Sequence, residues 1–448
     1  MATRTREFII SNDVNTDWFA SAGFGVFIHF GHAAHRGWEL SWQMTGGVEG
    51  QHPPREPVAC DEYFANAAEF DPQDFDAVEW ARIIADSGAA YAVFTAKHHD
   101  GFAMFDTRLS DYSIAKTSPF GRDLTAELVA ALREAGVRIG LYLSLPDWYH
   151  AEYPRMTDET VTKPYRIGSY QRVSEAQWKR YRAFFIGQLT ELLTNYGVVD
   201  VLWLDGEFEH TPEEWDFAEI RRLVASLQPG CVVNDRCVGF GDFATPEQQI
   251  PERVPAGPWE ICMTMTDSWG WVPDDGPWKS TPSILATLAE TVSSGGNLLL
   301  NVGPRGDGRI PEEAASRLDD IGQWIRRNAS AVYGSISRPA DLRAPLPLGR
   351  KIDSDGEHVF VYCTLRPWDS ITVSNIPVRR IESVHVVGDS RTLDFVGIAS
   401  LPEVHAGKAD PRGELVITIP PDVADLLAPV IDIVLRDEQS PTPLTTHG

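Results

Sequence analysis

Short, almost continuous apolar runs alternate with longer amphipathic stretches from about residue 24 of the chain. An apolar run without polar alternation is typical of a strand buried on both faces of a parallel sheet. The predicted strands are Gly25–Phe30, Tyr91–Lys97, Arg138–Leu145, Val199–Asp205, Cys231–Asp235, Trp259–Met265 and Asn297–Val302. The helices predicted around them are Phe75–Ser87, Asp123–Ala135, Glu175–Tyr196, Pro212–Leu227, Pro282–Val292 and Pro311–Arg327. A strand–helix repeat over about 300 residues favours a (β/α)8-like barrel, which need not be regular.

The pattern changes after Tyr333. There the short β-rich runs are separated by Gly, Pro and Asp: Val359–Cys363, Ser370–Val373, Val384–Val387 and Leu415–Ile419. Such runs predict a C-terminal antiparallel β-sandwich. We therefore expect a barrel domain that carries the chemistry over residues 1–336, a β-sandwich domain over 337–437 and a disordered tail over 438–448.

Charge and apolar run length narrow the choice of partner and compartment. With 39 Lys+Arg and 64 Asp+Glu, the net charge is −25, which disfavours nucleic acid and anionic membranes because both are polyanions. No apolar run approaches the ~20 residues of a membrane span, and the first ten residues lack a signal-peptide core. The five cysteines form no Cys-x-x-Cys pair. We expect a soluble, cytoplasmic protein.

Polar and aromatic side chains lie at the carboxyl ends of five predicted strands: His29, His98, His99, Tyr142, Trp203, Asp205 and Arg236. The carboxyl ends of barrel strands converge on one mouth. Imidazoles, carboxylates and a guanidinium can bind hydroxyl groups, and aromatic rings provide flat apolar surface. The sequence therefore predicts a site for a neutral, hydroxyl-rich ligand.

Cleavage of a glycoside needs two carboxyl groups in different protonation states. Asp205 ends a buried strand and precedes Gly206, which favours it as nucleophile over a simple turn cap. Glu247, beside Pro246 in the loop 237–258, is the candidate acid, since partial desolvation would keep it protonated. Glu260 is the main alternative, and spacing alone leaves the choice open. Weaker alternatives are Glu207 and Asp267.

A metal site is the other interpretation of the histidines. Its candidate ligands are His29, His32, His35, His98, His99 and Asp205. His29 and His32 are three residues apart, whereas one face of a strand presents alternate residues. Imidazoles that bind hydroxyl groups are therefore favoured, and we expect neither a metal ion nor an organic cofactor.

Six stretches, in chain order, carry a family resemblance: Gly25–Gly31, Thr95–Phe102, Gly140–Ser144, Leu202–Gly206, Val233–Arg236 and Gly296–Pro304. Over residues 17–334 they resemble family 29 of the glycoside hydrolases, the retaining α-L-fucosidases. The later β-rich region resembles that family's C-terminal sandwich.

The resemblance implies roles for these residues. Asp205 would form a fucosyl-enzyme ester and Glu247 would be the acid/base, with Glu260 retained as the alternative because this position varies in the family. His29, His98 and His99 would bind fucose hydroxyls, and Arg236 would lie near the nucleophile. The other substrate-binding residues implied are Phe27, Tyr142, Trp203 and Trp269 around the C6 methyl group, and Glu39 and Trp42 in the family's Glu-Trp element.

The expected function is that of an exo-acting retaining α-L-fucosidase, which hydrolyses terminal fucose from small glycosides or oligosaccharides by double displacement. Three alternatives stay open: a metal-dependent barrel hydrolase, a carbohydrate-binding barrel without turnover, and the same chemistry on an α-L-galactoside. The sequence leaves room for a homo-oligomer.

Overall fold

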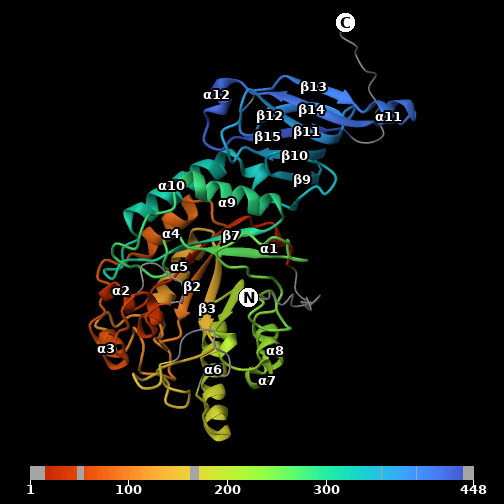
Figure 1. The fold of residues 1–448 in the computed structure, drawn as a ribbon. Coiled ribbons are helices and arrows are strands. Elements are labelled where there is room, and N and C mark those ends of the chain that lie inside the picture. The colour runs from red at the N-terminus through yellow and green to blue at the C-terminus, as the bar shows by residue number, and fades with distance from the viewer. Residues whose placement is uncertain (1–15, 48–54, 162–170, 355, 390, 437–448) are drawn as a thin grey trace.

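The computed structural model describes residues 16–47, 55–161, 171–354, 356–389 and 391–436. A parallel sheet with surrounding helices forms the larger part, and two antiparallel sheets form the smaller C-terminal part (Figure 1). The predicted tail over 438–448 lies outside the described residues. None of the described helices has both the length and the apolar composition that a membrane span requires.

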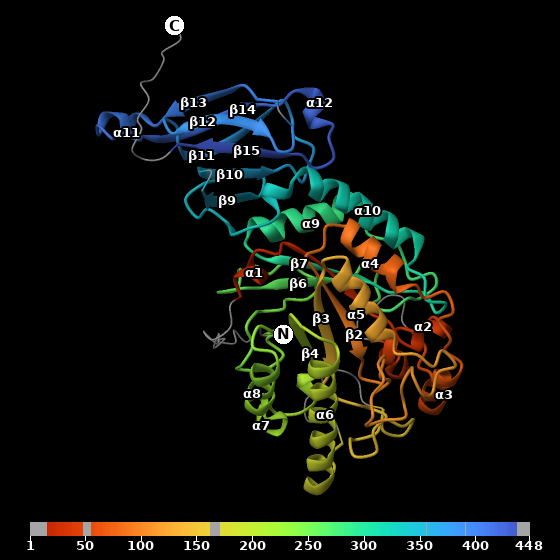
Figure 2. The same ribbon diagram turned by 180° about the vertical axis from the view of Figure 1, so that it is seen from behind.

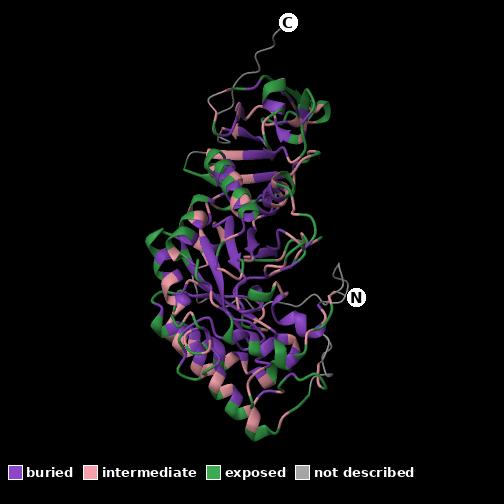
Figure 3. Ribbon diagram, turned by 90° about the vertical axis from the view of Figure 1, so that its left-hand side faces the viewer, coloured by how far each residue is buried: buried purple, intermediate pink, exposed green. Residues whose placement is uncertain are grey.

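The described residues form a sheet of seven parallel strands in the order β5-β4-β3-β2-β1-β7-β6. The strands are β1 Phe24–Ile28, β2 Tyr91–Lys97, β3 Arg138–Ser144, β4 Val201–Asp205, β5 Val232–Val233, β6 Glu260–Met263 and β7 Asn297–Val302. Nearly every residue in them is buried (Figure 3), which explains their continuous apolar character. The seven predicted strands are confirmed. Two of them have the predicted ends, and the other five differ by one or two residues at one or both ends.

The gap between the edge strands β5 and β6 is filled by residues 243–247. The N–H of Asp242 donates to Val233 O at 2.7 Å, and the N–H of Glu260 donates to Ala244 O at 2.9 Å. Isolated parallel bridges join Asn234 to Phe243 and Glu247 to Cys262. This closing segment, residues 243–247, completes an irregular barrel, as predicted.

Helices cover the outside of the barrel: α4 Ala77–Asp86, α5 Leu124–Glu134, α6 Glu175–Asn195, α8 Phe217–Leu227, α9 Thr281–Ser293 and α10 Glu312–Arg327. In the view from behind, α4, α5 and α10 lie outside the strands (Figure 2). The loop after β1 adds short helices: α2 Ala33–Arg36, a 3₁₀ helix at Leu40–Thr45 (η1) and α3 Cys60–Ala65.

The prediction of one helix over Pro212–Leu227 is wrong. The structure has two helices, α7 (Pro212–Trp215) and α8, because Asp216 takes a left-handed conformation with φ 50°. The N–H of Asp216 donates to Pro212 O at 3.0 Å, and its side chain accepts from the N–H of Glu219 at 3.2 Å. One residue thus ends α7 and caps α8.

The C-terminal region is an antiparallel two-sheet sandwich, as predicted. One sheet has the order β12-β15-β10-β9-β8, from Ile381–Val386, Val430–Leu435, Gly356–Tyr362, Leu348–Asp353 and Ile336–Ser337. The other has the order β11-β14-β13, from Ser370–Pro377, Arg412–Thr418 and Phe395–Ala399. Val359, Val373 and Leu415 belong to a separate apolar core. Trp324 of α10 donates to Ala428 O at 2.8 Å and fastens this region to the barrel.

Candidate active site

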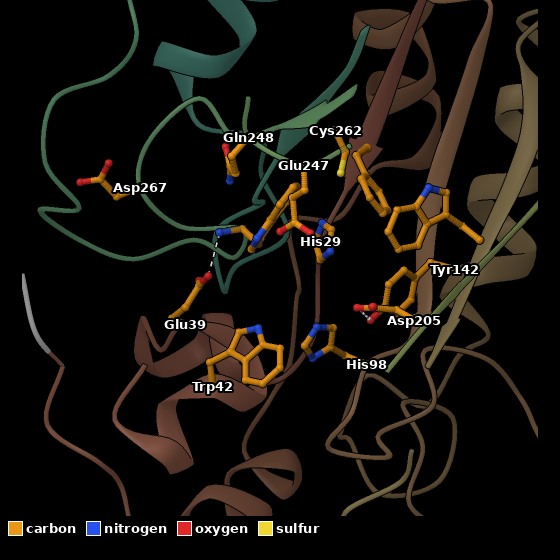
Figure 4. Close-up of a pocket in the computed structure, with 13 residues that line it drawn as sticks. His29, Glu39, Trp42, His98, Tyr142, Asp205, Glu247, Gln248, Cys262 and Asp267 are labelled. Atoms are coloured by element: carbon orange, nitrogen blue, oxygen red, sulfur yellow. Dashed lines mark hydrogen bonds between the residues drawn. The ribbon is translucent and has the colours of Figure 1, made fainter. Parts of the chain in front are cut away.

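One pocket of about 230 Å³ opens at the carboxyl ends of the barrel strands (Figure 4). This central pocket is lined by Phe27, His29, Glu39, Trp42, His98, Tyr142, Trp203, Asp205, Glu247, Gln248, Cys262, Asp267 and Trp269. Its volume is below the roughly 300–1,000 Å³ of typical ligand sites. The pocket therefore suits a ligand of about one sugar ring.

Asp205 ends β4 and faces the central pocket, with 18% of its side chain exposed. Its Oδ2 accepts a hydrogen bond from Tyr142 Oη at 3.0 Å, and its Oδ1 lies 3.5 Å from Arg236 Nη1. The next residue, Gly206, turns with φ +83°, and a Cβ there would lie 2.3 Å from Pro146 Cδ. The carboxylate is thus held in one orientation at a tight turn that only glycine fits.

Three buried imidazoles lie beside Asp205, and each has Nδ1 engaged. Nδ1 of His29 lies 2.6 Å from Asn301 Oδ1, Nδ1 of His98 lies 2.7 Å from Ser41 Oγ, and Nδ1 of His99 contacts Ser144 Oγ. Burial lowers the pKa of His29 to about 4 and of His99 to about 3, and it also lowers the pKa of His98. The three rings are therefore neutral near pH 7.

The Nε2 of His99 lies 3.6 Å from Asp205 Oδ2 and has no hydrogen-bond partner among the described residues. His99 itself is fully buried beside the central pocket and is not one of its lining residues. A buried polar atom without a partner costs free energy. Of the three predicted hydroxyl-binding imidazoles, His29 and His98 therefore line the central pocket and His99 lies behind the lining.

Glu247 lies at the end of the closing segment, where residue 248 has φ +60° and its N–H donates to Cys262 O at 2.9 Å. Its Oε2 accepts from Arg236 Nη2 at 3.1 Å. Burial raises the pKa of Glu247, and the negative charge of Asp205 adds to this, although Arg236 opposes it. About a third of the side chain still reaches solvent.

Arg236 contacts both carboxylates from behind the pocket lining. Its Nη1 faces Asp205, its Nη2 faces Glu247, and its guanidinium lies 5.4 Å from the Trp203 ring centroid. Trp203 in turn stacks on Tyr142, with ring centroids 5.6 Å apart and planes at 19°. One cation therefore contacts both candidate catalytic groups.

Glu39 joins two loops at the edge of the central pocket. Its carboxylate accepts from the N–H of Trp269 at 2.8 Å and of Gly270 at 3.0 Å. Burial raises the pKa of Glu39 to about 7. Trp42, on η1, lies 4.9 Å from His99 between ring centroids. The structure thus brings together the Glu and the Trp of the predicted substrate-binding set.

Glu260 is fully buried below the pocket floor and is not one of the lining residues. Its carboxylate accepts from Tyr91 Oη at 2.5 Å and from Trp203 Nε1 at 2.7 Å. Burial raises its pKa to about 7. The Trp203 ring separates it from the pocket, so the geometry favours Glu247 over Glu260 as the group beside a ligand.

The remaining histidine candidates lie elsewhere. His32 is buried with Nε2 3.0 Å from Tyr112 Oη, and His35 lies 3.7 Å from Glu69 Oε2 near the surface. Within the described ranges, no group of three or more His, Cys, Asp and Glu side chains is arranged to hold a metal ion.

Residues 248 and 262 line the central pocket but were not predicted from the sequence, and Asp267 was predicted only as a weak alternative acid. Gln248 directly follows Glu247, so the motif that singled out Glu247 could have included it. Cys262 follows Glu260 by two on β6 and therefore points to the same side of the strand. Its apolar surroundings gave no sign of a pocket position.

The sequence matches the family Alpha-L-fucosidase over residues 6–330. Tissue alpha-L-fucosidase of Macaca fascicularis is 32% identical over 336 residues, which cover 71% of this chain and 69% of that protein. Alpha-L-fucosidase isoenzyme 1 from Paenibacillus thiaminolyticus is similar in structure, with a TM-score of 0.78 and 29% identity over 94% of this chain and 99% of that one. Thermotoga maritima alpha-fucosidase in complex with fucose has a TM-score of 0.74 and 27% identity, over 94% and 97% of the two chains.

The family match spans more than half of the chain and agrees with the resemblance carried by its six motif stretches. The barrel and the sandwich are both covered by the structural similarity. This chain therefore belongs to the α-L-fucosidase family of glycoside hydrolases.

Proposed function

We propose that the protein is an exo-acting, retaining α-L-fucosidase that works by double displacement. The observation that carries this proposal is the pair Asp205 and Glu247, which face one pocket and contact the same guanidinium of Arg236. A relative of known structure, from Thermotoga maritima, is described in complex with fucose. The small volume of the pocket suits one terminal sugar ring.

In the first step, an Asp205 oxygen bonds to the anomeric carbon while the bond from that carbon to the leaving oxygen breaks. Glu247 gives its proton to the leaving oxygen. In the second step, Glu247 takes a proton from water, the water oxygen bonds to the anomeric carbon, and the ester bond to Asp205 breaks. Two inversions leave fucose with its original configuration, and both carboxyl groups return to their starting states.

The aromatic wall of the pocket supports fucose over a sugar with a C6 hydroxyl group. The ring centroids of Phe27 and Trp203 are 5.2 Å apart, and those of Phe27 and Trp269 are 6.0 Å apart. A methyl group gains from contact with this surface, whereas a hydroxyl group there would be left without a partner. We therefore expect α-L-galactosides to be poorer substrates than α-L-fucosides.

The anomeric configuration of the first product tests the mechanism. Proton NMR of aryl α-L-fucoside hydrolysis should show α-L-fucose first, before mutarotation. With Asp205→Ala, hydrolysis should nearly cease, and added azide should give the inverted β-L-fucosyl azide through a single displacement. Initial release of β-L-fucose by the wild-type enzyme would overturn the proposal.

A further inference from the structure

A second cavity of about 360 Å³ lies beside the central pocket, outside the carboxyl ends of β6 and β7. We call it the side cavity. It is lined by residues of β7, of the loops that follow β6 and β7, and of the start of α10, among them Asn301, Trp271, Asp274, Trp278, Arg305 and Glu313. The mechanism above uses none of these residues except through Asn301, which orients His29.

A single stretch of chain separates the two cavities. Asp267 and Trp269 line the central pocket, whereas Ser268 and Gly270 line the side cavity. Asn301 crosses the same wall, since its Nδ2 donates to Trp269 O at 2.6 Å. The two cavities therefore lie back to back, one residue apart.

Asp267 and Gly276 meet where the two cavities adjoin. A Cβ on Gly276, which lines the side cavity, would lie 3.1 Å from Asp267 Oδ2. In Figure 4, Asp267 lies across the central pocket from Asp205, on the same side as Gln248. A saccharide that extends out of the central pocket past Glu247 and Gln248 would reach the side cavity across Asp267 and Gly276.

The wall is held rigidly from both sides. The carboxylate of Asp275 accepts from the N–H of Ser268 at 2.8 Å and from its hydroxyl at 2.6 Å, and Arg55 donates to Asp275 and to Ser268. A Cβ on Gly303 would lie 2.6 Å from the backbone of Gly270, so β7 and the wall are in close contact. A preformed cavity loses little conformational entropy when a ligand binds.

The lining chemistry fits a neutral sugar. Trp271 and Trp278 are half-buried, and each is covered on one face by a guanidinium, from Arg305 at 5.7 Å and Arg317 at 5.2 Å. Indole surface packs against the C–H faces of a pyranose, while charged groups of both signs can bind its hydroxyls. The lining carries three carboxyl side chains, Asp274, Asp275 and Glu313, and one guanidinium, that of Arg305, and Asp275 is already paired with Arg55. This excess of acidic groups disfavours an anionic sugar and leaves oxygen acceptors for the hydroxyls of a neutral one.

We propose that the side cavity is a second sugar-binding subsite, which holds the neutral hexose units to which the terminal fucose is attached. This assignment rests on the proposed function of the central pocket. It makes the enzyme prefer fucosylated oligosaccharides over simple aryl fucosides through binding, without changing the chemistry at Asp205.

The test compares two substrates in the variant Trp271→Ala. For 2′-fucosyllactose we expect KM to rise about 5- to 10-fold, the effect of losing one aromatic contact. For 4-nitrophenyl α-L-fucoside, kcat and KM should stay within twofold of wild type. The matched control is Trp368→Ala, since Trp368 lies in the C-terminal sandwich with 85% of its surface exposed; both substrates should be unaffected.

Direct binding keeps the test independent of linkage preference. Saturation-transfer NMR with lactose and N-acetyllactosamine should show contact with wild type and with Asp205→Ala, and loss of contact in Trp271→Ala or, if that variant misfolds, in Arg305→Gln. Absence of both disaccharide signals in the wild type would overturn the subsite, as would equal KM changes for both substrates. If the wild-type protein did not hydrolyse aryl fucosides at all, the proposed function would be overturned instead.

Discussion

The indole Nε1 of Trp203 donates a 2.7 Å hydrogen bond to the buried carboxylate of Glu260, directly beneath the central pocket. Tyr91 holds the other carboxylate oxygen at 2.5 Å. Trp203 forms part of the pocket floor, stacks on Tyr142 and lies against Arg236. The layer below the site therefore fixes the ring that positions both partners of Asp205.

Replacing Glu260 should disturb this support without removing proton donation. Glu260→Leu leaves the N–H of Trp203 and the hydroxyl of Tyr91 buried without acceptors, at a cost of about 1–3 kcal/mol each. We expect a lower midpoint of urea unfolding and a lower kcat/KM for aryl fucosides with good and poor leaving groups alike. Glu260→Gln, which keeps one acceptor oxygen, should recover much of both. A loss confined to poor leaving groups would identify Glu260 as the acid.

Replacing Glu247 should show the opposite pattern. In Glu247→Ala, the leaving oxygen departs without a proton, which costs about 10²- to 10⁴-fold in rate for leaving groups of high pKa. Activated 2,4-dinitrophenyl fucoside needs no such help and should lose far less. Steady-state kcat/KM across a series of aryl fucosides measures this slope, with Glu247→Gln as the isosteric control. An equal loss for all leaving groups would contradict the assignment.

The hydroxyl group of Tyr142 should matter more to turnover than to binding. In Tyr142→Phe the ring and its stacking on Trp203 remain, but the 3.0 Å hydrogen bond to Asp205 is lost. Hydrogen bonds to charged groups contribute about 1.5–3 kcal/mol, so kcat should fall about 10- to 100-fold while KM changes little. Tyr153→Phe, outside the central pocket, is the control. A variant with unchanged kcat would show that Asp205 does not depend on this contact.

Replacing Glu39 should change how the stability of the protein depends on pH. Because burial raises its folded-state pKa to about 7, from 4.5, the folded protein holds a proton that the unfolded chain has already lost between these pH values. The contribution of Glu39 to stability therefore falls as pH rises from about 4.5 to about 7. Glu39→Gln removes this dependence. As pH rises across that range, the free energy of unfolding of the variant should therefore increase relative to that of wild type by about 3 kcal/mol. Parallel stability curves in urea for the two proteins would refute this.

Asp216 should matter to stability and not to activity. Alanine at its left-handed position is strained by about 1–2 kcal/mol and removes the cap of α8, which costs about 1 kcal/mol more. Asp216→Asn tolerates the conformation and keeps a capping oxygen, so it should be nearly neutral. Urea unfolding distinguishes the two variants, and aryl fucoside hydrolysis should be the same in both. Equal stability of the Ala and Asn variants would disprove the capping role.

Most of the barrel could be predicted because its strands are buried on both faces, so that composition alone marks them. The split at Asp216 could not, since the apolar periodicity of α7 and α8 runs on without a Gly or Pro between them. The closing segment was expected to be loop because five residues around Pro246 show no strand pattern. Only its bridges to β5 and β6 reveal its place.

Residues that end a long strand could be placed at the mouth of the barrel from the sequence, whereas residues in the loops were harder to place. Asp205 and His29 follow directly from strand position. The choice between Glu247 and Glu260 depends on depth: Glu260 begins β6, far from the carboxyl end where the mouth lies, and Glu247 is carried up beside Cys262 by the closing segment. Pairing between segments that are distant in the sequence decides which of the two carboxyl groups reaches the mouth. A local sequence pattern therefore could not predict it. The side cavity depends likewise on contacts between two separate loops.

The number of residues in the closing segment determines where Glu247 lies. Residues 243–247 bridge β5 to β6 and end on Glu247, so adding or deleting one residue there would shift the bridges and move the carboxyl group of Glu247 at the same time. Loop grafting to broaden glycan preference should therefore leave this stretch untouched and work on connections held by neither neighbouring strand. The part of the mouth that looks most like a replaceable loop is the part least open to redesign.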